Sequence, residues 1–343
     1  ALWGLWHYYL VNSDFPKAVT LAEQLLDLAR TTNDHAFLSD AYRAIGETCL
    51  WSGEFSQAKA YFEKGIDLTD FRQQHSSFAE SPGVSCRFFS AIALWFLGYP
   101  DQALLRSHEA VTMAQELNHP LSLSAAHHFA GWLYLLRQES QATMEHAEAA
   151  MAIAADQGFV FFIAYDTMLK GWALAEQGHI KEGMSQLHEG LIAFQVTGTK
   201  ILVPQWMVVL AEQYGIMGQV ESALSVLADA QILSEKNDGE GYFIAEMLRL
   251  KGQLMIRGKK DKVQEGADYD EAATYFLRAI KLAQQQDAKS LELRAVVSLS
   301  RIWQSQGKKS DAFKLLSKTY DWFEEGFGTP DLIAAKVLIE ELS

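Results

Sequence analysis

Proline and cysteine are both scarce in this chain of 343 residues, which contains 6 prolines and 2 cysteines. The scarcity of proline leaves long stretches free to form helix, because proline interrupts a helix interior. Cys49 and Cys86 are too few for a disulfide framework, and no Cys/His spacing matches a zinc site. We therefore expect an all-helical protein in which both cysteines are small buried residues.

The chain also lacks an excess of positive charge and long hydrophobic runs. The formal net charge is −14, from 29 Lys and Arg against 43 Asp and Glu, and no Lys/Arg-rich segment offers the positive surface that nucleic-acid binding requires. The longest nearly uninterrupted apolar stretch, Phe88 to Tyr99, is about 12 residues long, whereas a bilayer span needs about 20. No signal peptide opens the chain. We expect a cytoplasmic protein that binds neither nucleic acid nor membrane.

Motifs that carry chemistry are absent as well. The chain has neither a G-x-x-x-x-G-K-[ST] phosphate-binding loop nor a G-x-S-x-G nucleophile elbow. His127 and His128 are adjacent, so on a helix their side chains diverge by about 100° and cannot share one metal ion as an i, i+4 pair would. We predict that this chain is not an enzyme and needs no cofactor or metal.

A repeat with a period of about 40 residues is the strongest feature present. In each copy a small residue follows the turn of a hairpin, at Ala18, Ala58, Ala103, Ala142, Gly183, Ala223, Ala272 and Ala312. A fixed period in this range is typical of stacked helical hairpins, since one hairpin is too thin to bury its own apolar face. The period predicts a right-handed α–α superhelix of eight hairpins over residues 1–343, organised as a single domain.

The second repeat shows the local pattern. Ala58, Phe62 and Gly65 are separated by four and then three residues, which places them on one stripe of a helix. Small residues in that stripe allow close helix pairing. Segments 72–85 and 258–268 break the period and are expected to be surface loops, with a binding role as the alternative. Thr329 and Pro330 predict the start of a C-terminal capping helix.

Several segments carry a resemblance to a known family. The strings AKSLELRA (288–295), SLSRIWQSQG (298–307) and YDWFEEGFGTPD (320–331), supported by GYPDQALLRS (98–107) and NHPLSL (118–123), resemble the C-terminal tetratricopeptide (TPR) region of large bacterial signalling ATPases. In that family a cyclase, kinase or transcription-regulator module precedes an ATPase, which precedes the repeats. The resemblance implies a TPR-like solenoid and a signalling context. Because the chain lacks a nucleotide-binding loop and begins with Ala, we expect a fragment whose parent carries any catalytic activity.

The repeat register indicates which residues line an inner groove. In TPR-like stacks the first helix of each hairpin forms the concave wall, and rigid aromatic and Arg side chains dominate binding energy. The alternative is that the aromatic residues pack between hairpins. The expected partner is a peptide, a protein or another domain of the same polypeptide; the alternative function is a small-molecule sensor regulating an N-terminal ATPase or cyclase. The predicted groove residues are Arg43, Phe88, Trp95, His127, Tyr165, Met168, Trp172 and Arg249.

Overall fold

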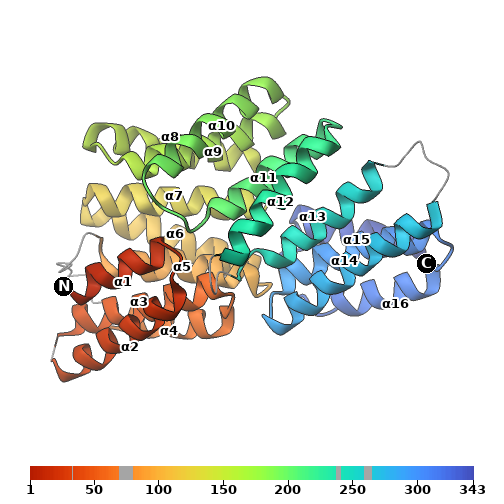
Figure 1. Cartoon of the computed structure of the whole chain (residues 1–343). Coiled ribbons are helices and arrows are strands. Elements are labelled where there is room, and N and C mark those ends of the chain that lie inside the picture. Colours follow the sequence, from red (N-terminus) through yellow and green to blue (C-terminus); the bar gives the residue numbers. More distant parts are fainter. Residues whose placement is uncertain (33, 69–79, 237–240, 259–264) are drawn as a thin grey trace. The chain divides into compact units, whose positions relative to one another are not determined.

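The computed structural model describes the chain apart from residues 33, 69–79, 237–240 and 259–264, and apart from the side chains of 265–268 (Figure 1). Within that part of the chain, seventeen helices account for the regular secondary structure. Most of the two predicted insertions, 72–85 and 258–268, lies outside the described residues. The prediction of an all-α fold is confirmed.

The helices alternate as the first and second members of eight hairpins, followed by one more helix. The first helices are α1 (Leu2–Val11), α3 (His35–Ser52), α5 (Pro82–Phe96), α7 (Pro120–Leu136), α9 (Val160–Glu176), α11 (Val203–Ile216), α13 (Ile244–Arg257) and α15 (Lys289–Ser305). The second helices are α2 (Phe15–Thr31), α4 (Phe55–Asp67), α6 (Pro100–Leu117), α8 (Ser140–Gln157), α10 (Ile180–Val196), α12 (Val220–Lys236), α14 (Glu265–Gln285) and α16 (Lys309–Tyr320), and the last helix is α17 (Pro330–Leu342).

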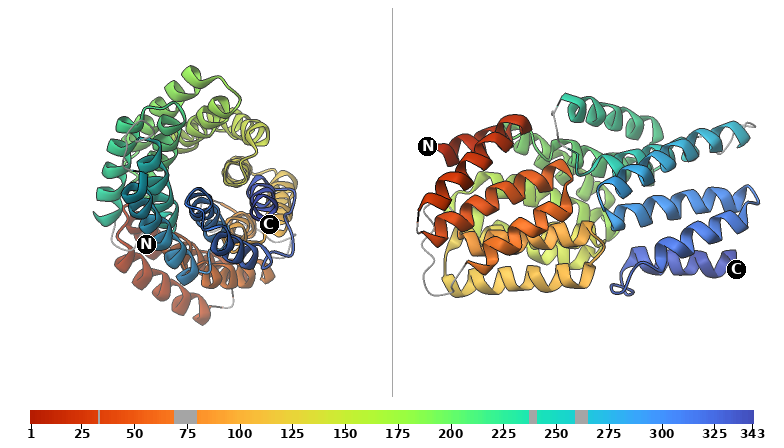
Figure 2. Two further views of the ribbon diagram at one scale, coloured as in Figure 1. Left: turned by 90° about the vertical axis from the view of Figure 1, so that its right-hand side faces the viewer. Right: turned by 90° about the horizontal axis from the view of Figure 1, so that it is seen from below.

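Packing divides the chain into two compact units. Unit 1 comprises Ala1–Trp95, Gln102–Val203 and Lys236–Gly241, and unit 2 comprises Phe96–Asp101, Pro204–Glu235 and Tyr242–Ser343. In unit 1 successive helices pack side by side, as α7, α8, α9 and α10 do (Figure 2). The organisation of all 343 residues as one domain stays a prediction.

Local signals explain where the helices begin and end. The Asp34 side chain accepts hydrogen bonds from the backbone N–H groups of Ala36 (2.9 Å) and Phe37 (3.1 Å), so it satisfies donors that the first turn of α3 leaves free. Gly53 ends α3 with a φ of 85°, a left-handed conformation that glycine adopts without a steric penalty. These two residues fix both ends of the helix that carries Arg43.

Small residues in the repeat allow helices to touch, as the pattern predicts. A Cβ atom added at Gly183 in α10 would lie 2.5 Å from the carbonyl oxygen of Gly171 in α9. A Cβ added at Gly46 in α3 would lie 2.6 Å from the Phe62 ring. A side chain at Gly183 would therefore force α9 and α10 apart, and one at Gly46 would displace the Phe62 ring.

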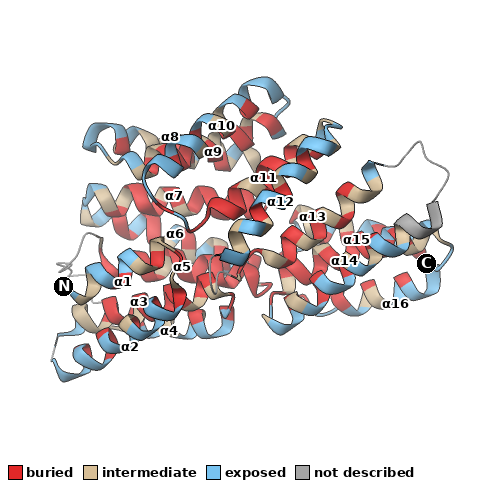
Figure 3. Cartoon of the chain, in the orientation of Figure 1, coloured by how far each residue is buried: buried red, intermediate tan, exposed pale blue. Residues whose placement is uncertain are grey.

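First and second helices differ in how they are buried (Figure 3). Second helices such as α2 and α4 are amphipathic and bury one stripe, whereas α3, α7, α13 and α15 are buried on most of their circumference. As a consequence, most buried charged side chains and buried His and Gln side chains lie on first helices: Asp40, Arg43, Glu47, His128, Asp166, Gln205, Gln213, Glu246, Arg249 and Glu292.

The C-terminal capping helix is confirmed. In unit 2, Leu332, Ala335 and Leu338 of α17 join a hydrophobic core with Val296 of α15 and Leu316 of α16. Pro330 occupies the first turn of α17 as predicted, but the Thr329 hydroxyl donates to the Gly326 carbonyl (2.7 Å) and makes no cap hydrogen bond to the helix. The helix is thus anchored mainly by its apolar face.

The α10–α11 connection ties the two ends of unit 1 together. The backbone N–H groups of Lys200 and Ile201 both donate to the carbonyl oxygen of Val11 at the end of α1, at 2.8 Å and 3.2 Å. Leu202, the next residue, is buried and has a φ of 73°, which is uncommon for a bulky side chain. Of the two cysteines, Cys86 is buried as expected, and Cys49 is half-buried.

Candidate functional site

Most of the predicted groove residues lie inside the packed protein. Seven of the eight have less than a tenth of their surface exposed, and His127 is half-buried. The buried seven are Arg43, Phe88, Trp95, Tyr165, Met168, Trp172 and Arg249. Their part in ligand binding stays a prediction. A ligand would have to displace helix packing to reach them.

The aromatic members of the predicted groove contact neighbouring helices. The Phe88 ring of α5 stacks on Phe129 of α7, with ring centroids 4.2 Å apart. Tyr165 of α9 meets His128 of α7 edge to face at 4.2 Å and lies 5.7 Å from Phe194 of α10. Such contacts stabilise aromatic pairs beyond simple burial. These side chains therefore hold helices of unit 1 together.

Arg249 belongs to an ion-pair network in unit 2. Its guanidinium bonds both carboxylate oxygens of Glu246, at 2.7 Å and 2.8 Å, and lies 3.2 Å from Glu212. Arg294 extends the network to Asp331 at 2.9 Å. The charge of Arg249 holds the pKa of the buried Glu246 carboxyl below its usual range, despite the opposing effect of burial. Arg249 is thus charge-compensated within the protein.

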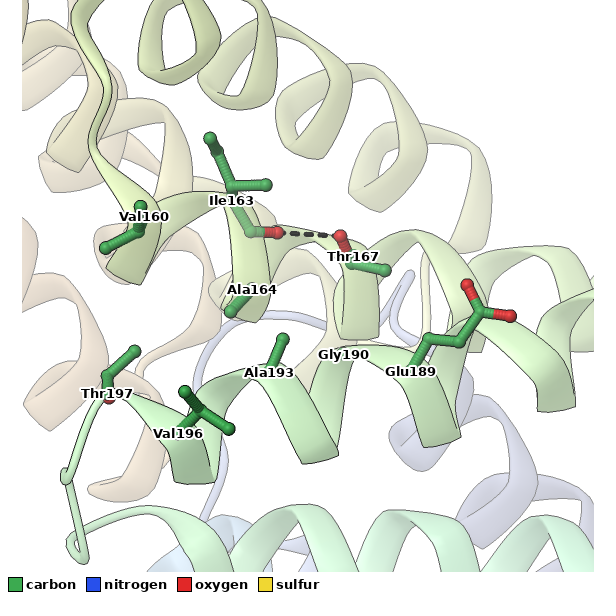
Figure 4. A pocket seen from close by; sticks show the side chains of 9 residues that line it. All are labelled: Val160, Ile163, Ala164, Thr167, Glu189, Gly190, Ala193, Val196 and Thr197. Atoms are coloured by element: carbon green, nitrogen blue, oxygen red, sulfur yellow. Dashed lines mark hydrogen bonds between the residues drawn. The ribbon is translucent and has the colours of Figure 1, made fainter.

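An accessible hollow lies on unit 1 between α9 and α10 (Figure 4). It has a volume of about 550 Å³, within the range of ligand-binding clefts. Val160 and Val196 at its margin are 68% and 82% exposed. We call it the α9–α10 groove, and its lining consists of Val160, Ile163, Ala164, Thr167, Glu189, Gly190, Ala193, Val196 and Thr197.

Small residues create this groove. Gly190 has no side chain, and a Cβ there would lie 2.6 Å from Met168 and 2.9 Å from the Ala164 carbonyl oxygen. Ala164 and Ala193 add only methyl groups between the two helices. The Thr167 hydroxyl donates to the Ile163 carbonyl at 2.7 Å, which leaves mainly its methyl group to line the groove. The result is a shallow apolar floor.

The groove faces away from the preceding hairpin. On the other side of α9, Asp166 bonds His128 of α7 at 2.8 Å, and Leu169 packs against Gly131. Val160 and Leu169 are nine residues apart, so at 100° per residue they point in opposite directions from the helix axis. The α9–α10 groove therefore occupies the surface of this hairpin that is turned away from α7.

The repeat register predicts a different face of α9 as the binding surface. The predicted residues Tyr165, Met168 and Trp172 form one stripe, and the groove uses the stripe of Val160, Ile163 and Thr167 instead. The prediction favoured the buried stripe because that stripe carries large aromatic side chains. The sequence does contain a signal for the groove, namely apolar Val160 and Ile163 in one helix and small Gly190 and Ala193 in the next.

A charged stripe on α3 is the second notable feature of unit 1. Asp40, Arg43 and Glu47 are spaced by three and four residues and lie on one side of the helix. The Arg43 guanidinium donates to Glu80 at 2.6 Å and to the Ser85 hydroxyl at 2.9 Å. Burial raises the pKa values of Asp40 and Glu47 to about 7, although the positive charge of Arg43 opposes this rise.

No protein-family model matches the chain. An uncharacterized protein of Rhizobium meliloti (strain 1021) is 22% identical over 313 residues, which are 87% of this chain and 28% of that protein. The chain thus spans less than a third of that relative's length.

Two solved structures resemble almost the whole chain. A Rap protein complexed with competence and sporulation factor has a TM-score of 0.63 at 11% identity, with 99% of this chain and 96% of that chain covered. The Rap conjugation gene regulator of plasmid pLS20, in complex with the Phr* peptide, has a TM-score of 0.57 at 10% identity, with 99% and 94% covered. Together with the eight hairpins, this likeness defines the fold as a TPR-like α-solenoid.

Across the described ranges, no helix is both long enough and apolar enough to cross a bilayer.

Proposed function

We propose that this chain is a non-catalytic protein-interaction module that binds an amphipathic helix of a partner protein in the α9–α10 groove. The observation that carries the proposal is an open apolar surface whose margin residues, Val160 and Val196, are 68% and 82% exposed. Exposed apolar side chains along a groove can pack against the apolar face of a partner helix.

The packing of helices in unit 1 suggests a helix as the occupant of the α9–α10 groove. Within unit 1, α9 packs on both helices of the preceding hairpin, α7 and α8. The α9–α10 groove lies on the side of its own hairpin that is turned away from α7, where a further helix can pack in the same manner. Its apolar floor suits the i, i+3, i+4 side chains of a helix lying in a groove.

Charge constrains the partner's polar face. Glu189 lies at the groove and the chain carries a net charge of −14. A partner helix with Lys or Arg on its polar face would therefore associate faster, and more so at low salt. The two similar Rap structures are complexes with a factor and a peptide, which supports ligand binding by this fold.

A small-molecule sensor is the less supported alternative. A few hundred cubic ångströms suffice for a small ligand, but such ligands are usually buried on most of their surface. The exposed margin of the α9–α10 groove offers little enclosure. We further propose that the module belongs to a larger cytoplasmic bacterial signalling protein, in keeping with the short share of the Rhizobium meliloti relative that it spans.

The test is a selection followed by matched variants. Helical peptides selected from a displayed library on the wild-type protein are titrated by fluorescence anisotropy against wild type, Ala193→Trp and Val196→Asp. Ala193→Trp fills the groove and Val196→Asp places a charge on its margin, so both should weaken binding by about tenfold or more. Leu105→Asp, at an exposed residue of α6 outside the groove, is the control and should retain wild-type affinity. Equal affinity in all four proteins would refute the proposal.

A further inference from the structure

A second, smaller recess lies on unit 1 among α2, α3 and the start of α4. Its volume is about 180 Å³, roughly the volume that six molecules occupy in liquid water, so a ligand of a few non-hydrogen atoms would fill it. Val19 is 41% exposed and Glu23, Glu54 and Gln57 are exposed, so a small ligand reaches the recess without displacing any helix. We call it the Cys49 recess, and its lining consists of Val19, Ala22, Glu23, Ile45, Thr48, Cys49, Ser52, Glu54, Gln57 and Tyr61.

The charged groups in the lining of the recess are acidic. Glu23 and Glu54 carry carboxylates, and the other lining side chains are apolar or neutral. Lys64 lies outside the lining, with its ammonium nitrogen 5.0 Å from the centre of the Tyr61 ring. The last turn of α3 and the first turn of α4 present helix dipoles of opposite sign, which offset each other. The two carboxylates therefore make the recess attractive to a cation.

Several hydrogen-bond donors of the recess are already engaged within the protein. The Ser52 hydroxyl donates to the Thr48 carbonyl at 3.0 Å, and the Thr48 hydroxyl donates to the Ala44 carbonyl at 2.8 Å. The Cys49 thiol donates to the Glu54 carboxylate. Burial and the Glu54 charge raise the pKa of this thiol to about 12, so it stays protonated near neutral pH. The Ser52 oxygen and the carboxylates consequently offer acceptors to a ligand.

We propose that the Cys49 recess binds the primary ammonium group of a short aliphatic amine. An ammonium group has three donors and no acceptor, which matches a lining that offers acceptors and negative charge. Its donors bond the Glu23 and Glu54 carboxylates, and its alkyl chain packs on the apolar wall formed by Val19, Ala22 and Ile45. Alkylamines are cations at neutral pH because their pKa lies near that of lysine, about 10. The site is separate from the α9–α10 groove.

The Cys49 thiol reports occupancy, because it lies in the lining. The neutral reagent methyl methanethiosulfonate is added to the full chain carrying Leu105→Cys, and mass spectrometry follows the modification of each thiol. n-Pentylamine and its neutral isostere 1-pentanol compete with the reagent at low salt. We expect n-pentylamine to half-protect Cys49 at a concentration at least about threefold lower than 1-pentanol, a modest preference because exposed charge pairs are weak. The thiol introduced on α6, at a position 61% exposed, should react at the same rate with and without either ligand.

Variants attribute the preference to the two carboxylates. Glu23→Gln combined with Glu54→Gln should abolish the preference for the amine, whereas Asp27→Asn, at an exposed acid of α2 outside the lining, should retain it. Rates with and without ligand are compared within each variant, so any effect of Glu54→Gln on the reactivity of the thiol itself cancels. Saturation-transfer NMR of the same two ligands measures binding independently of the thiol, and circular dichroism checks that each variant keeps its helix content.

A third probe, N-acetyl-L-lysinamide, distinguishes the two sources of an alkylammonium group. Protection by n-pentylamine alone assigns the recess to free amines, and equal or stronger protection by the lysine probe assigns it to a lysine side chain. Equal protection by n-pentylamine and 1-pentanol, or protection by neither, overturns the proposal, as does an amine preference that survives the double substitution. Because these probes contain no helix and the variants lie outside the α9–α10 groove, failure here is distinct from failure of the proposed function.

Discussion

The Nδ1 atoms of His127 and His146 lie 3.1 Å apart, joining α7 to α8 by an imidazole–imidazole hydrogen bond. Tyr134 stacks on His146 with ring centroids 5.2 Å apart, and its hydroxyl lies 3.1 Å from Nε2 of His108 on α6. The sequence predicted His127 beside His128 and on the inner groove, and it did not predict this cluster of three histidines. A hydrogen bond between two imidazoles requires an unprotonated nitrogen on one of them.

This pair predicts a loss of stability in mild acid. Burial, with the charges of His127 and His108, lowers the pKa of His146 to about 4, and burial lowers that of His127; Glu145 acts in the opposite direction on His146. The pKa of His146 is lower in the folded state than its unfolded value of about 6.5. Its contribution to folding stability is therefore complete above pH 6.5 and is lost as the pH falls toward 4. In urea unfolding, the unfolding free energy of His146→Gln should fall less between pH 7 and pH 5 than that of wild type. An identical decline would contradict the assignment, and His35→Gln, at an exposed residue, serves as control.

Asp40→Asn should stabilise the protein, most strongly in alkaline solution. The pKa of Asp40 is raised in the folded state, so its contribution is complete below the unfolded pKa of about 4 and is lost as pH rises through about 7. Removing the ionisable group should therefore raise the unfolding free energy by about 1 kcal/mol or more near pH 8 and by less near pH 5. Thermal and urea unfolding at both pH values measure this. A variant destabilised at pH 8 would show that Asp40 has a partner in solution.

Gly183→Ala should destabilise unit 1. The added methyl group would lie 2.5 Å from the Gly171 carbonyl oxygen and 2.6 Å from the Ala175 nitrogen, so α9 and α10 must separate. Overpacking of this kind costs about 1–3 kcal/mol. Gly4→Ala is the matched control: it lies within α1, has nothing within 4 Å of the added Cβ, and should gain about 0.5–1 kcal/mol. Differential scanning calorimetry should show opposite shifts in melting temperature; a neutral Gly183→Ala would argue against close packing.

Arg249→Met should destabilise the protein severely, because it leaves the buried Glu246 carboxylate without its bidentate partner. Breaking a buried ion pair on one side costs about 3–5 kcal/mol. Adding Glu246→Gln to this variant should restore part of the loss, since no unpaired charge then remains. Urea denaturation of wild type, the single variant and the double variant measures the recovery. If Arg249→Met unfolds like wild type, the residue is free for the binding role that its sequence position suggested.

The fold was predictable because the repeat encodes it locally. Ala58, Phe62 and Gly65 are all buried, and Gly53 ends α3 in the left-handed conformation. Each hairpin carries its own small residues, so the period alone locates turns and helix faces. The capping helix that starts at Pro330 followed from the same kind of local signal.

The candidate sites were less predictable because they depend on what packs around each helix. The register placed Arg43 and Tyr165 on inner faces, but it could not show that neighbouring first helices bury those faces almost completely. Nor could it pair His127 with His146, since that contact depends on the angle between α7 and α8. The α9–α10 groove likewise arises from the absence of side-chain volume at Gly190, which an inventory of large binding residues overlooks.

Site-specific photo-crosslinking tests the central claim, partner binding in the α9–α10 groove, most directly. The photoreactive residue p-benzoylphenylalanine is placed at Glu189 on the edge of the groove or, in a matched protein, at Leu105 on α6, and each is irradiated with a selected helical peptide. We predict that Glu189 captures the peptide, that an excess of unlabelled peptide suppresses this capture, and that Leu105 captures little. Equal capture at both positions, or capture at Leu105 alone, would contradict the account.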